Sequence, residues 1–582
     1  MKKYIIPFLF TGLLAFVGCN KKSTEPSSEA QAKVEVPPPA VSDAEIAPAE
    51  RAAKLGFAQY LPANVSAYSA VINGSSVIDR MWKTPVGTVI KERLEQEGIS
   101  FDDLSDPQAQ MSGILQLGGA QYGEDYFVAY GESAPKVSKE VIEFSDRMSY
   151  YVGRMAVYAG NAAVAGKLFE ENVHPNKLLT ELFTKPLKGL PANFIHMFRE
   201  VDMPSYYQGV KVSGEDSRAL VRDQLEAVPN FFSMIEVGVE PLVVERGGAQ
   251  FEGYKFSGKK MQEELAEGQG GMRLVLEPGL KQFGMSQQEI DEFIKLIEAK
   301  TIVALVGEVH GYVVLFMGSS EDDFVLVDDV EDSLCASDKI KFTDDYLDND
   351  LFTYGFSDGG MGYDLSAIEK ICYKLGGSFA KGLSDQLAES DSLGNTQEIE
   401  VILDNIDKQA RGLAAMFKEA DAGYVAYLED GIKVEMQGGS NMPQYDMQSA
   451  HTLAPISQGK GQVLFANWAT DPQYNEGLMT LIDRFVEVSY LMSKQVLPLL
   501  ASRAAADEGN ADFIQYNASL QMFDQMFSKD LLDVWQALRT NMAEGLGAET
   551  ALVIDVNGSL PKVPMLPKAI IEGGKMPRVA YV

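Results

Sequence analysis

Histidine and cysteine are scarce in this chain, whose 582 residues include only four histidines and three cysteines. The histidines are spread along the sequence at positions His174, His196, His310 and His451. A zinc site needs several such ligands at close spacing, and the sequence has neither a His-x-x-x-His nor a Cys-x-x-Cys pattern. We therefore predict no zinc centre, and no motif indicates a bound cofactor.

Positive charge is also in short supply. The chain has 50 lysine and arginine residues against 83 aspartate and glutamate residues, which gives a formal net charge of −33 at pH 7. Such a chain repels nucleic-acid phosphates and anionic lipid surfaces, so we predict no nucleic-acid partner. Hydrophobic residues make up 46% of the chain and aromatic residues 10%, which distinguishes it from acidic disordered proteins and predicts large folded cores.

Long hydrophobic runs are missing after the first residues. A transmembrane helix needs about 20 consecutive apolar residues, and the apolar run Tyr4–Val17 is too short for this purpose. Lys2 and Lys3 precede the run, and Gly18 and Cys19 follow it. A positive start, a short apolar segment and a small residue are typical of an export signal.

The stretch Phe16-Val17-Gly18-Cys19 resembles the lipobox of exported bacterial lipoproteins. The resemblance implies that residues 1–18 are a signal peptide and that Cys19 becomes the lipidated first residue of the mature protein. It also implies a place in the cell envelope, on the outer membrane if the source has one and otherwise on the outer face of the plasma membrane. A plain cleaved secretory signal is the alternative, and it gives Cys19 no evident role.

The segment after the signal has the composition of a disordered tether. Asn20–Glu50 contains five prolines and no aromatic residue, so it cannot bury enough apolar surface to fold. We therefore assign residues 19–50 to a tether that holds the folded body roughly 30 Å from the membrane on average. The lipid is then the expected contact with the membrane.

The body after residue 50 is predicted to consist of helices followed by β-hairpins. The clearest unit starts with a capping box at Ser286 and Glu289, continues as an amphipathic helix, and ends in two strands that turn at His310-Gly311. A similar unit ends in a hairpin at Asp430-Gly431. The pattern predicts an α+β fold in which antiparallel sheets of meandering hairpins are covered by helices.

Recurrence of the helix and hairpin unit indicates two similar lobes, residues 51–280 and 281–460. Ile114–Gly119 resembles Ile302–Gly307 in sequence, although chance similarity among valine-rich strands is an equally simple explanation. The remaining segment, residues 461–582, is predicted to hold a long helical hairpin with flanking strands.

The helical hairpin is indicated by two amphipathic stretches, residues 478–492 and 513–538. Their apolar stripes are predicted to pack against each other or against a sheet. A pliable binding groove around Met522 and Met526 is the alternative.

Two cysteines remain when Cys19 is assigned to the lipid. An oxidising compartment would allow Cys335 and Cys372 to form a disulfide across a 37-residue loop, which would stabilise the fold by roughly 4 kcal/mol. Two buried free thiols are the alternative, because free cysteine is often a core residue.

An acidic run between residues 321 and 350 offers oxygen ligands for calcium. The candidate ligands are Asp344, Asp345, Asp348 and Asp350. They do not match the twelve-residue calcium loop, because its glycine is missing. We therefore favour a solvated acidic loop, and a calcium site is the alternative interpretation.

Few motifs indicate catalysis. Ser378 and Lys381 have the Ser-x-x-Lys spacing of penicillin-recognising enzymes, but the other motifs of that family are absent, as is the Gly-x-Ser-x-Gly elbow of serine hydrolases. Whether the protein is an enzyme stays open, with a non-enzymatic role favoured.

Three functions follow from these features. The first is a membrane-anchored envelope lipoprotein with a binding or structural role toward a protein or ligand that the sequence does not identify. The second is a hydrolase of envelope polymers that uses carboxylates not recognisable in one sequence. The third is a carrier of an apolar ligand. The body is also faintly similar to large uncharacterised bacterial envelope proteins, in its first strand after Leu61-Pro62 and its Asp430-Gly431 hairpin, and this similarity implies no activity. An apolar cavity would favour the carrier, and a cleft with two facing carboxylates would favour the hydrolase.

Overall fold

The computed structural model describes the following residues of the chain: 46–74, 80, 83, 88, 125–164, 181, 185–211, 214–233, 237–359, 361, 365–390, 395–428, 432–438, 442–446, 449, 451–459, 462–496, 498–499, 515, 518–519, 521–522, 533–541, 549–559 and 575–581. Among these residues, no helix combines the length and the hydrophobicity needed to cross a bilayer.

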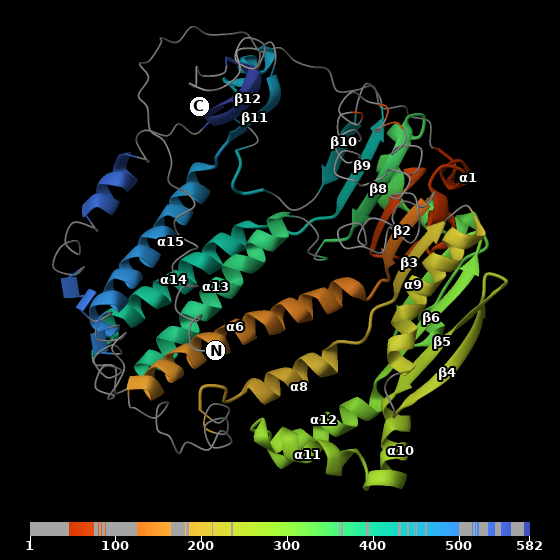
Figure 1. The fold of residues 1–582 in the computed structure, drawn as a ribbon, viewed down its shortest axis with the longest axis horizontal. Coiled ribbons are helices and arrows are strands. Elements are labelled where there is room, and N and C mark those ends of the chain that lie inside the picture. Colours follow the sequence, from red (N-terminus) through yellow and green to blue (C-terminus); the bar gives the residue numbers. More distant parts are fainter. Residues whose placement is uncertain are drawn as a thin grey trace, which may run out of the picture. The chain divides into compact units, whose positions relative to one another are not determined.

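A ten-stranded antiparallel sheet organises the body, with the strand order β10-β9-β8-β1-β2-β3-β7-β6-β5-β4 (Figure 1). Its strands are β1 (Ala67–Val71), β2 (Asp125–Tyr130), β3 (Tyr206–Lys211), β4 (Val239–Arg246), β5 (Ala249–Ser257), β6 (Thr301–Val309), β7 (Tyr312–Gly318), β8 (Asp350–Ser357), β9 (Ala422–Leu428) and β10 (Ile432–Gly438). Every neighbouring pair is antiparallel.

The two faces of this sheet are covered by different segments. Successive side chains of a strand point to opposite faces, and in β7 Val314 and Phe316 enter one core while Val313 and Leu315 enter another. The second core is closed by α9 (Glu215–Ser233), which packs against β5, β6 and β7. The first core is closed by the start of the described chain and by a series of 3₁₀ turns between β7 and β8.

The start of the described chain is fixed to these turns by a buried ion pair. Arg51 lies in α1 (Pro48–Ala52) and is 2% exposed. Its Nε and Nη2 donate to the two carboxylate oxygens of Asp344, each at 2.6 Å, and its Nη1 donates to the carbonyl of Cys335 at 3.0 Å. A planar guanidinium fits a carboxylate in this two-pronged way. The pair therefore joins α1 to residues almost 300 positions away.

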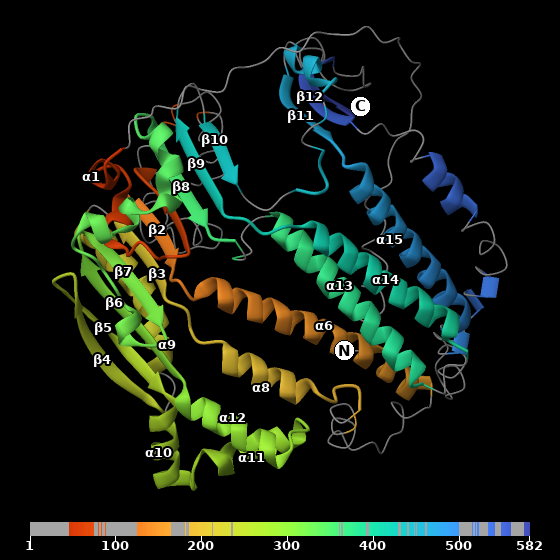
Figure 2. The ribbon, with the colours of Figure 1, turned by 180° about the vertical axis from the view of Figure 1, so that it is seen from behind.

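Four helices pack side by side in the order α6-α13-α14-α15 (Figure 2). They are α6 (Ala134–Val164), α13 (Leu365–Ala388), α14 (Gln397–Met416) and α15 (Pro472–Leu491). Glycines bring two of them close together, because a Cβ atom at Gly382 of α13 would overlap the backbone carbonyl of Tyr150 in α6. A Cβ atom at Gly153 of α6 would likewise overlap the carbonyl of Phe379. The α6–α13 contact thus depends on both glycines.

A second helical group is built from α8, α10, α11 and α12 around its own core. Its members are α8 (Leu190–Glu200), α10 (Gly258–Gln269), α11 (Met272–Gln282) and α12 (Gln287–Ala299). The predicted capping box at the start of α12 is confirmed, since Ser286 and Glu289 exchange both hydrogen bonds. The capping box ends the preceding turn and lets Ile290 face the core.

A three-stranded antiparallel sheet lies near the C-terminus, with β12 (Glu549–Ser559) between β11 (Gln462–Ala469) and β13 (Lys575–Tyr581). Glu549 accepts hydrogen bonds from the backbone N–H groups of Thr452 and Leu453, each at 2.8 Å, and from the Asn467 amide at 2.9 Å. Burial alone would raise the pKa of Glu549, but these hydrogen bonds favour its charged form and lower the pKa to about 2.

The predicted α+β class is confirmed, as are the strands and the turn of the hairpin at residues 301–318. The predicted lobes 51–280 and 281–460 do not form separate sheets. Strand β5 of the first pairs with β6 of the second, and β3 pairs with β7 in the same way. Hydrogen bonding between distant strands thus joins both segments in one sheet.

The predicted helical hairpin finds support in the described part of its second helix. Residues 533–541 are helical, and Trp535 donates a hydrogen bond to Asp483 of α15 at 2.9 Å. Arg539 forms an ion pair with the same carboxylate at 2.9 Å. Between α15 and residue 533, the structure describes residues 492–496, 498–499, 515, 518–519 and 521–522, and Met526 lies outside the described part of the chain.

Candidate functional site

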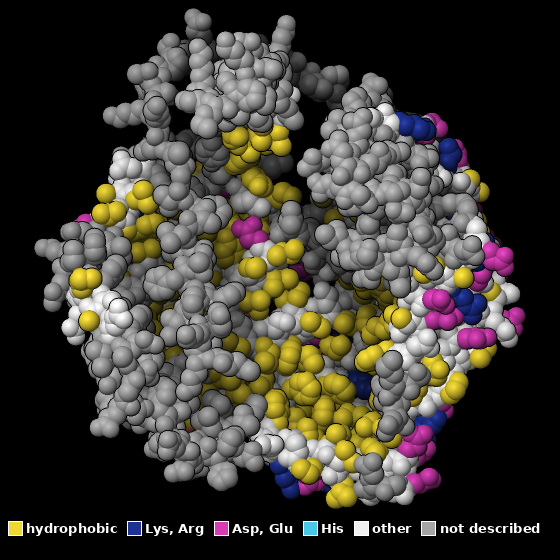
Figure 3. All heavy atoms as spheres, in the orientation of Figure 1, with side chains coloured by type: hydrophobic (Ala, Val, Ile, Leu, Met, Phe, Trp, Pro, Cys, Tyr) yellow, Lys and Arg dark blue, Asp and Glu magenta, His cyan; other side chains and the backbone are white. Residues whose placement is uncertain are grey.

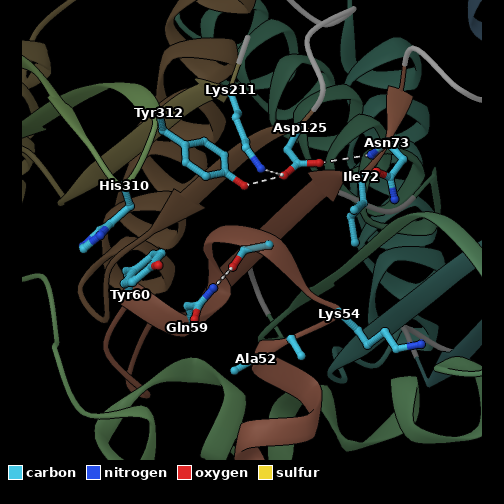
Figure 4. Close-up of a pocket in the computed structure, with 12 residues that line it drawn as sticks. Ala52, Lys54, Gln59, Tyr60, Ile72, Asn73, Asp125, Lys211, His310 and Tyr312 are labelled. Carbon is cyan, nitrogen blue, oxygen red and sulfur yellow. Dashed lines mark hydrogen bonds and ion pairs between the residues drawn. The ribbon is translucent and has the colours of Figure 1, made fainter. Parts of the chain in front are cut away.

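A polar pocket of about 340 Å³ opens near the end of β1 and the start of β2 (Figure 4). We define the polar pocket by its lining residues: Ala52, Ala53, Lys54, Gly56, Gln59, Tyr60, Ile72, Asn73, Asp125, Lys211, His310 and Tyr312. They come from the first described residues and from β2, β3 and the β6–β7 hairpin. The sheet therefore gathers them from four distant parts of the sequence.

Asp125 is the centre of the hydrogen bonds in the polar pocket. Its Oδ2 accepts a hydrogen bond from the Tyr312 hydroxyl at 2.6 Å and lies 3.8 Å from the Lys211 ammonium (Figure 4). Its Oδ1 accepts the backbone N–H of Asn73 at 3.1 Å. Burial raises the pKa of Tyr312 well above its usual range, and the charge of Asp125 adds to this. The phenol therefore stays protonated and acts as a donor to the carboxylate.

Two lining residues have an unusual backbone conformation. Asn73 and His310 have φ angles of 52° and 51°, a region that residues other than glycine seldom adopt. His310 and Gly311 are the two central residues of the tight β6–β7 turn, where positive φ is required. Asparagine is among the residues that tolerate this region best. The tight turn thus explains the conformation of His310, and the tolerance of asparagine accounts for that of Asn73.

The His310 ring stacks on Tyr60, with ring centroids 3.7 Å apart. Burial lowers the pKa of His310, so the ring is neutral at neutral pH. It therefore contributes an aromatic surface rather than a charge to the polar pocket.

The lining residues of the polar pocket do not match the two-carboxylate mechanism of glycoside hydrolysis. Asp125 is the one carboxylate among the lining residues, and both of its oxygens accept hydrogen bonds. Glycoside hydrolysis needs two carboxyl groups with separated pKa values on either side of the bond that is cleaved. The lining residues do not supply that pair.

The Ser378 and Lys381 pair also has a structural explanation. The Ser378 hydroxyl donates to Asp146 of α6 and accepts from Arg411 of α14 at 2.7 Å, which links three helices. Hydrogen bonds to nearby aspartates, Asp385 first, raise the pKa of Lys381 to about 12. A lysine that stays protonated cannot act as the base of a Ser-x-x-Lys mechanism.

A second cavity, of about 350 Å³, is lined entirely by apolar and aromatic side chains. We call it the apolar cavity and define it by its lining residues: Phe144, Met148, Tyr151, Val152, Met155, Leu187, Leu190, Phe194 and Phe283. Figure 3 shows hydrophobic side chains gathered over α6 and α8, the helices that contribute most of this lining. An apolar cavity of this kind favours the carrier interpretation over the hydrolase.

The helical spacing of α6 builds one wall of the apolar cavity. Phe144, Met148, Tyr151 and Met155 are spaced by three or four residues and therefore share one face of the helix. The opposite wall begins at the turn that leads into α8, where Gly189 has a φ of 92°. The sequence indicated no site here, although the regular spacing of large apolar residues on α6 was visible in it.

The one polar atom among the side chains of this lining is the Tyr151 hydroxyl. It accepts a hydrogen bond from the Asn193 amide at 2.9 Å, and the Asn193 carbonyl oxygen accepts one from Arg147 Nη1 at 3.0 Å. The bonding need of the hydroxyl is thus met by α8. The interior surface is left apolar.

The structure contradicts the predicted disulfide. Cys335 and Cys372 are both free thiols. Cys335 is fully buried in the core of the ten-stranded sheet, and burial raises its pKa to about 12. Cys372 is exposed on α13. The alternative of a buried thiol therefore applies to Cys335 alone.

The structure does not bring the four candidate calcium ligands together. Asp344 is held by Arg51 and Asp350 by Arg80, while Asp345 and Asp348 are exposed. In the part of the chain that the structure describes, no three His, Cys, Asp or Glu side chains form a group able to hold a metal ion. Asp344 has Arg51 as its partner, which the sequence did not reveal.

The predicted lipidation site, Cys19, lies outside the described residues. Comparisons with protein-family models, with curated proteins and with solved structures found no match to this chain. The features that bear on function are therefore the N-terminal segment that resembles a lipoprotein signal and the apolar cavity.

Proposed function

We propose that this protein is a membrane-anchored lipoprotein of the cell envelope that binds an apolar molecule in the apolar cavity. The cavity itself is the observation that supports binding. Its volume of about 350 Å³ falls within the range of about 300 to 1,000 Å³ typical of ligand pockets. It is more than twice the volume of an engineered apolar cavity of about 150 Å³ that binds benzene.

The composition of the lining determines the kind of ligand. Protein interiors are close-packed, and a void without partner atoms loses dispersion contacts around its whole surface. Water needs two to four polar partners, and the apolar lining of this solvent-facing cavity supplies none. An apolar molecule restores the lost contacts and leaves water, so both effects favour its binding.

The expected anchor gives this binding a role. A lipid on Cys19 and a tether over residues 19–50 would keep the body close to a membrane, which is where sparingly soluble molecules concentrate. The protein then captures, holds or passes on such molecules without any chemical step. This role unites the binding lipoprotein and the carrier that the sequence suggested as separate functions.

The experiment compares two valines of α6 that are equally exposed, of which one lines the apolar cavity and the other does not. Val152 lines the apolar cavity and is 43% exposed, whereas Val141 is 44% exposed and does not line it. We expect wild-type protein to bind dodecanol, measured by calorimetry. Val152→Trp should weaken this binding about tenfold or more, because the indole fills the space for the ligand, and Val141→Trp should leave it unchanged.

Two results would contradict the proposal. One is wild-type protein that does not bind dodecanol. The other is equal binding by wild type and both variants, which would place the alcohol elsewhere on the surface. Similar unfolding midpoints of the two variants would show that neither result comes from misfolding.

A further inference from the structure

The charges around the apolar cavity differ from those of the whole protein. Residues 134–164 and 185–200, which hold eight of its nine lining residues, contain seven basic and four acidic residues. In the whole chain, 83 acidic residues outnumber 50 basic ones. The two segments thus carry a local excess of basic residues in a strongly acidic protein, and two of these residues, Arg154 and Arg199, pair with Glu389 and Glu292 outside the segments.

Arg147 is a basic residue that hydrogen bonds link to the lining of the cavity. It lies between α6 and α8, where Asn193 bridges its guanidinium to the hydroxyl of the lining residue Tyr151. Its side chain is 38% exposed and forms an exposed ion pair with Glu143, with 3.8 Å between Nη2 and Oε2. A guanidinium has five N–H donors, and Asn193 accepts a hydrogen bond from one of its terminal nitrogens. The charge therefore borders the cavity and faces solvent.

Two lysines add to this charge at the other wall. Lys185 and Lys188 are exposed and flank Leu187, which is buried and lines the cavity. The run from residue 185 to 199 has no acidic residue. Exposed basic residues are thus sequence neighbours of lining residues both on α6 and in the turn that precedes α8.

We infer that the natural ligand is a single-chain amphiphile with an anionic head group. Its chain occupies the apolar cavity, and its head group binds Arg147 with support from Lys185 and Lys188. The volume of about 350 Å³, near the lower end of the range for ligand pockets, suits one chain. This inference rests on the proposed function and adds the charge of the ligand to it.

The test uses three amphiphiles with the same chain and different head groups: dodecanoate, dodecanol and dodecyltrimethylammonium. Each is titrated into the full chain, the two charged amphiphiles below their critical micelle concentrations and dodecanol below its solubility limit. We expect dodecanoate to bind most tightly and dodecyltrimethylammonium most weakly. Added salt should weaken the binding of dodecanoate and leave that of dodecanol almost unchanged, because screening acts on the charged head alone.

A substitution then locates the head group. Arg147→Gln should weaken dodecanoate binding about fivefold to tenfold, which corresponds to about 1 to 1.4 kcal/mol. Its affinity for dodecanol should not change, and this also shows that the cavity is intact. The matched control is Arg222→Gln on α9, because Arg222 is 46% exposed and also pairs with a glutamate one turn away. It should bind all three compounds like wild type.

The outcomes separate the inference from the proposed function. Equal affinity for dodecanoate and dodecanol would overturn the anionic head group and leave the apolar cavity as a binding site. Tightest binding of dodecyltrimethylammonium would overturn it as well. Binding of none of the three compounds would overturn both the inference and the proposed function.

Discussion

The contact between α6 and α13 predicts that the same substitution, glycine to alanine, has opposite effects on stability at two positions of α13. Gly376 and Gly382 both lie in α13, and alanine is favoured over glycine in a helix by about 1 kcal/mol. A Cβ atom at Gly376 meets nothing within 4 Å, whereas one at Gly382 overlaps the backbone carbonyl of Tyr150. Backbone cannot rotate away as a flexible side chain does, so the two helices must separate.

The expected changes in stability follow from helix preference and from overpacking. Gly376→Ala should stabilise the protein by up to about 1 kcal/mol. Gly382→Ala gains the same helix preference but adds an overpacking cost of about 1 to 3 kcal/mol. We therefore expect Gly382→Ala to be about 1 to 3 kcal/mol less stable than Gly376→Ala. The same contrast is expected on α6 between Gly153, whose Cβ would overlap the Phe379 carbonyl, and Gly160, which has open space.

The assay is urea unfolding followed by circular dichroism, with the midpoint and slope measured for each variant. A change in midpoint at constant slope reports a change in stability. Equal stability of Gly382→Ala and Gly376→Ala would refute the close approach of the two helices. Because α6 carries five of the nine residues that line the apolar cavity, Gly153→Ala should also weaken dodecanol binding, and Gly160→Ala should not.

Three further predictions concern the anchor, a buried ion pair and a shifted pKa. Cys19→Ser should give an unlipidated protein that no longer partitions with membranes, and acyl chains in its intact mass would contradict the lipobox interpretation. Arg51→Ala should lower the free energy of unfolding by about 3 to 5 kcal/mol, because it leaves the partly buried Asp344 carboxylate without its partner. Arg80→Ala removes one partner of an exposed pair and should cost at most about 1 kcal/mol. Equal unfolding midpoints of the two variants in urea would refute this difference. The pKa of Glu549 is lowered to about 2, so the charged carboxylate stabilises the fold fully above its unfolded pKa of about 4.3. The difference in stability between wild type and Glu549→Gln should therefore shrink as the pH falls from about 4.3 toward about 2. A difference in unfolding midpoint that does not change with pH would contradict this assignment.

The local structure of the chain was largely predictable from its sequence. The capping box before α12, the turn at His310-Gly311 and the apolar stripe of α14 depend on residues close together in the chain. The hydrogen bonds and packing that decide such features are made within a few residues. The fold class followed from their order.

The pairing of distant strands was not predictable in this way. Apolar strands such as β6 and β7 would suit many neighbours, and the choice of β3 beside β7 is made by tertiary packing. The disulfide prediction failed for the same reason, because contacts between distant residues are not encoded in local sequence. Cysteine count and spacing describe Cys335 and Cys372 equally, whereas only the fold buries the first in the sheet core and exposes the second on a helix.

The sequence by itself determined the expected address of the protein and the secondary structure of its body. A signal is recognised as a short linear segment, and helices and hairpins are specified by local periodicity and turn residues. The tertiary structure decided the candidate site. Leu187 and Phe283 reach the same cavity as Phe144 only because helices from distant parts of the chain pack around it, and the partner of Asp344 is an arginine almost 300 residues away. Cavities and buried ion pairs are properties of space between elements, which no local pattern encodes.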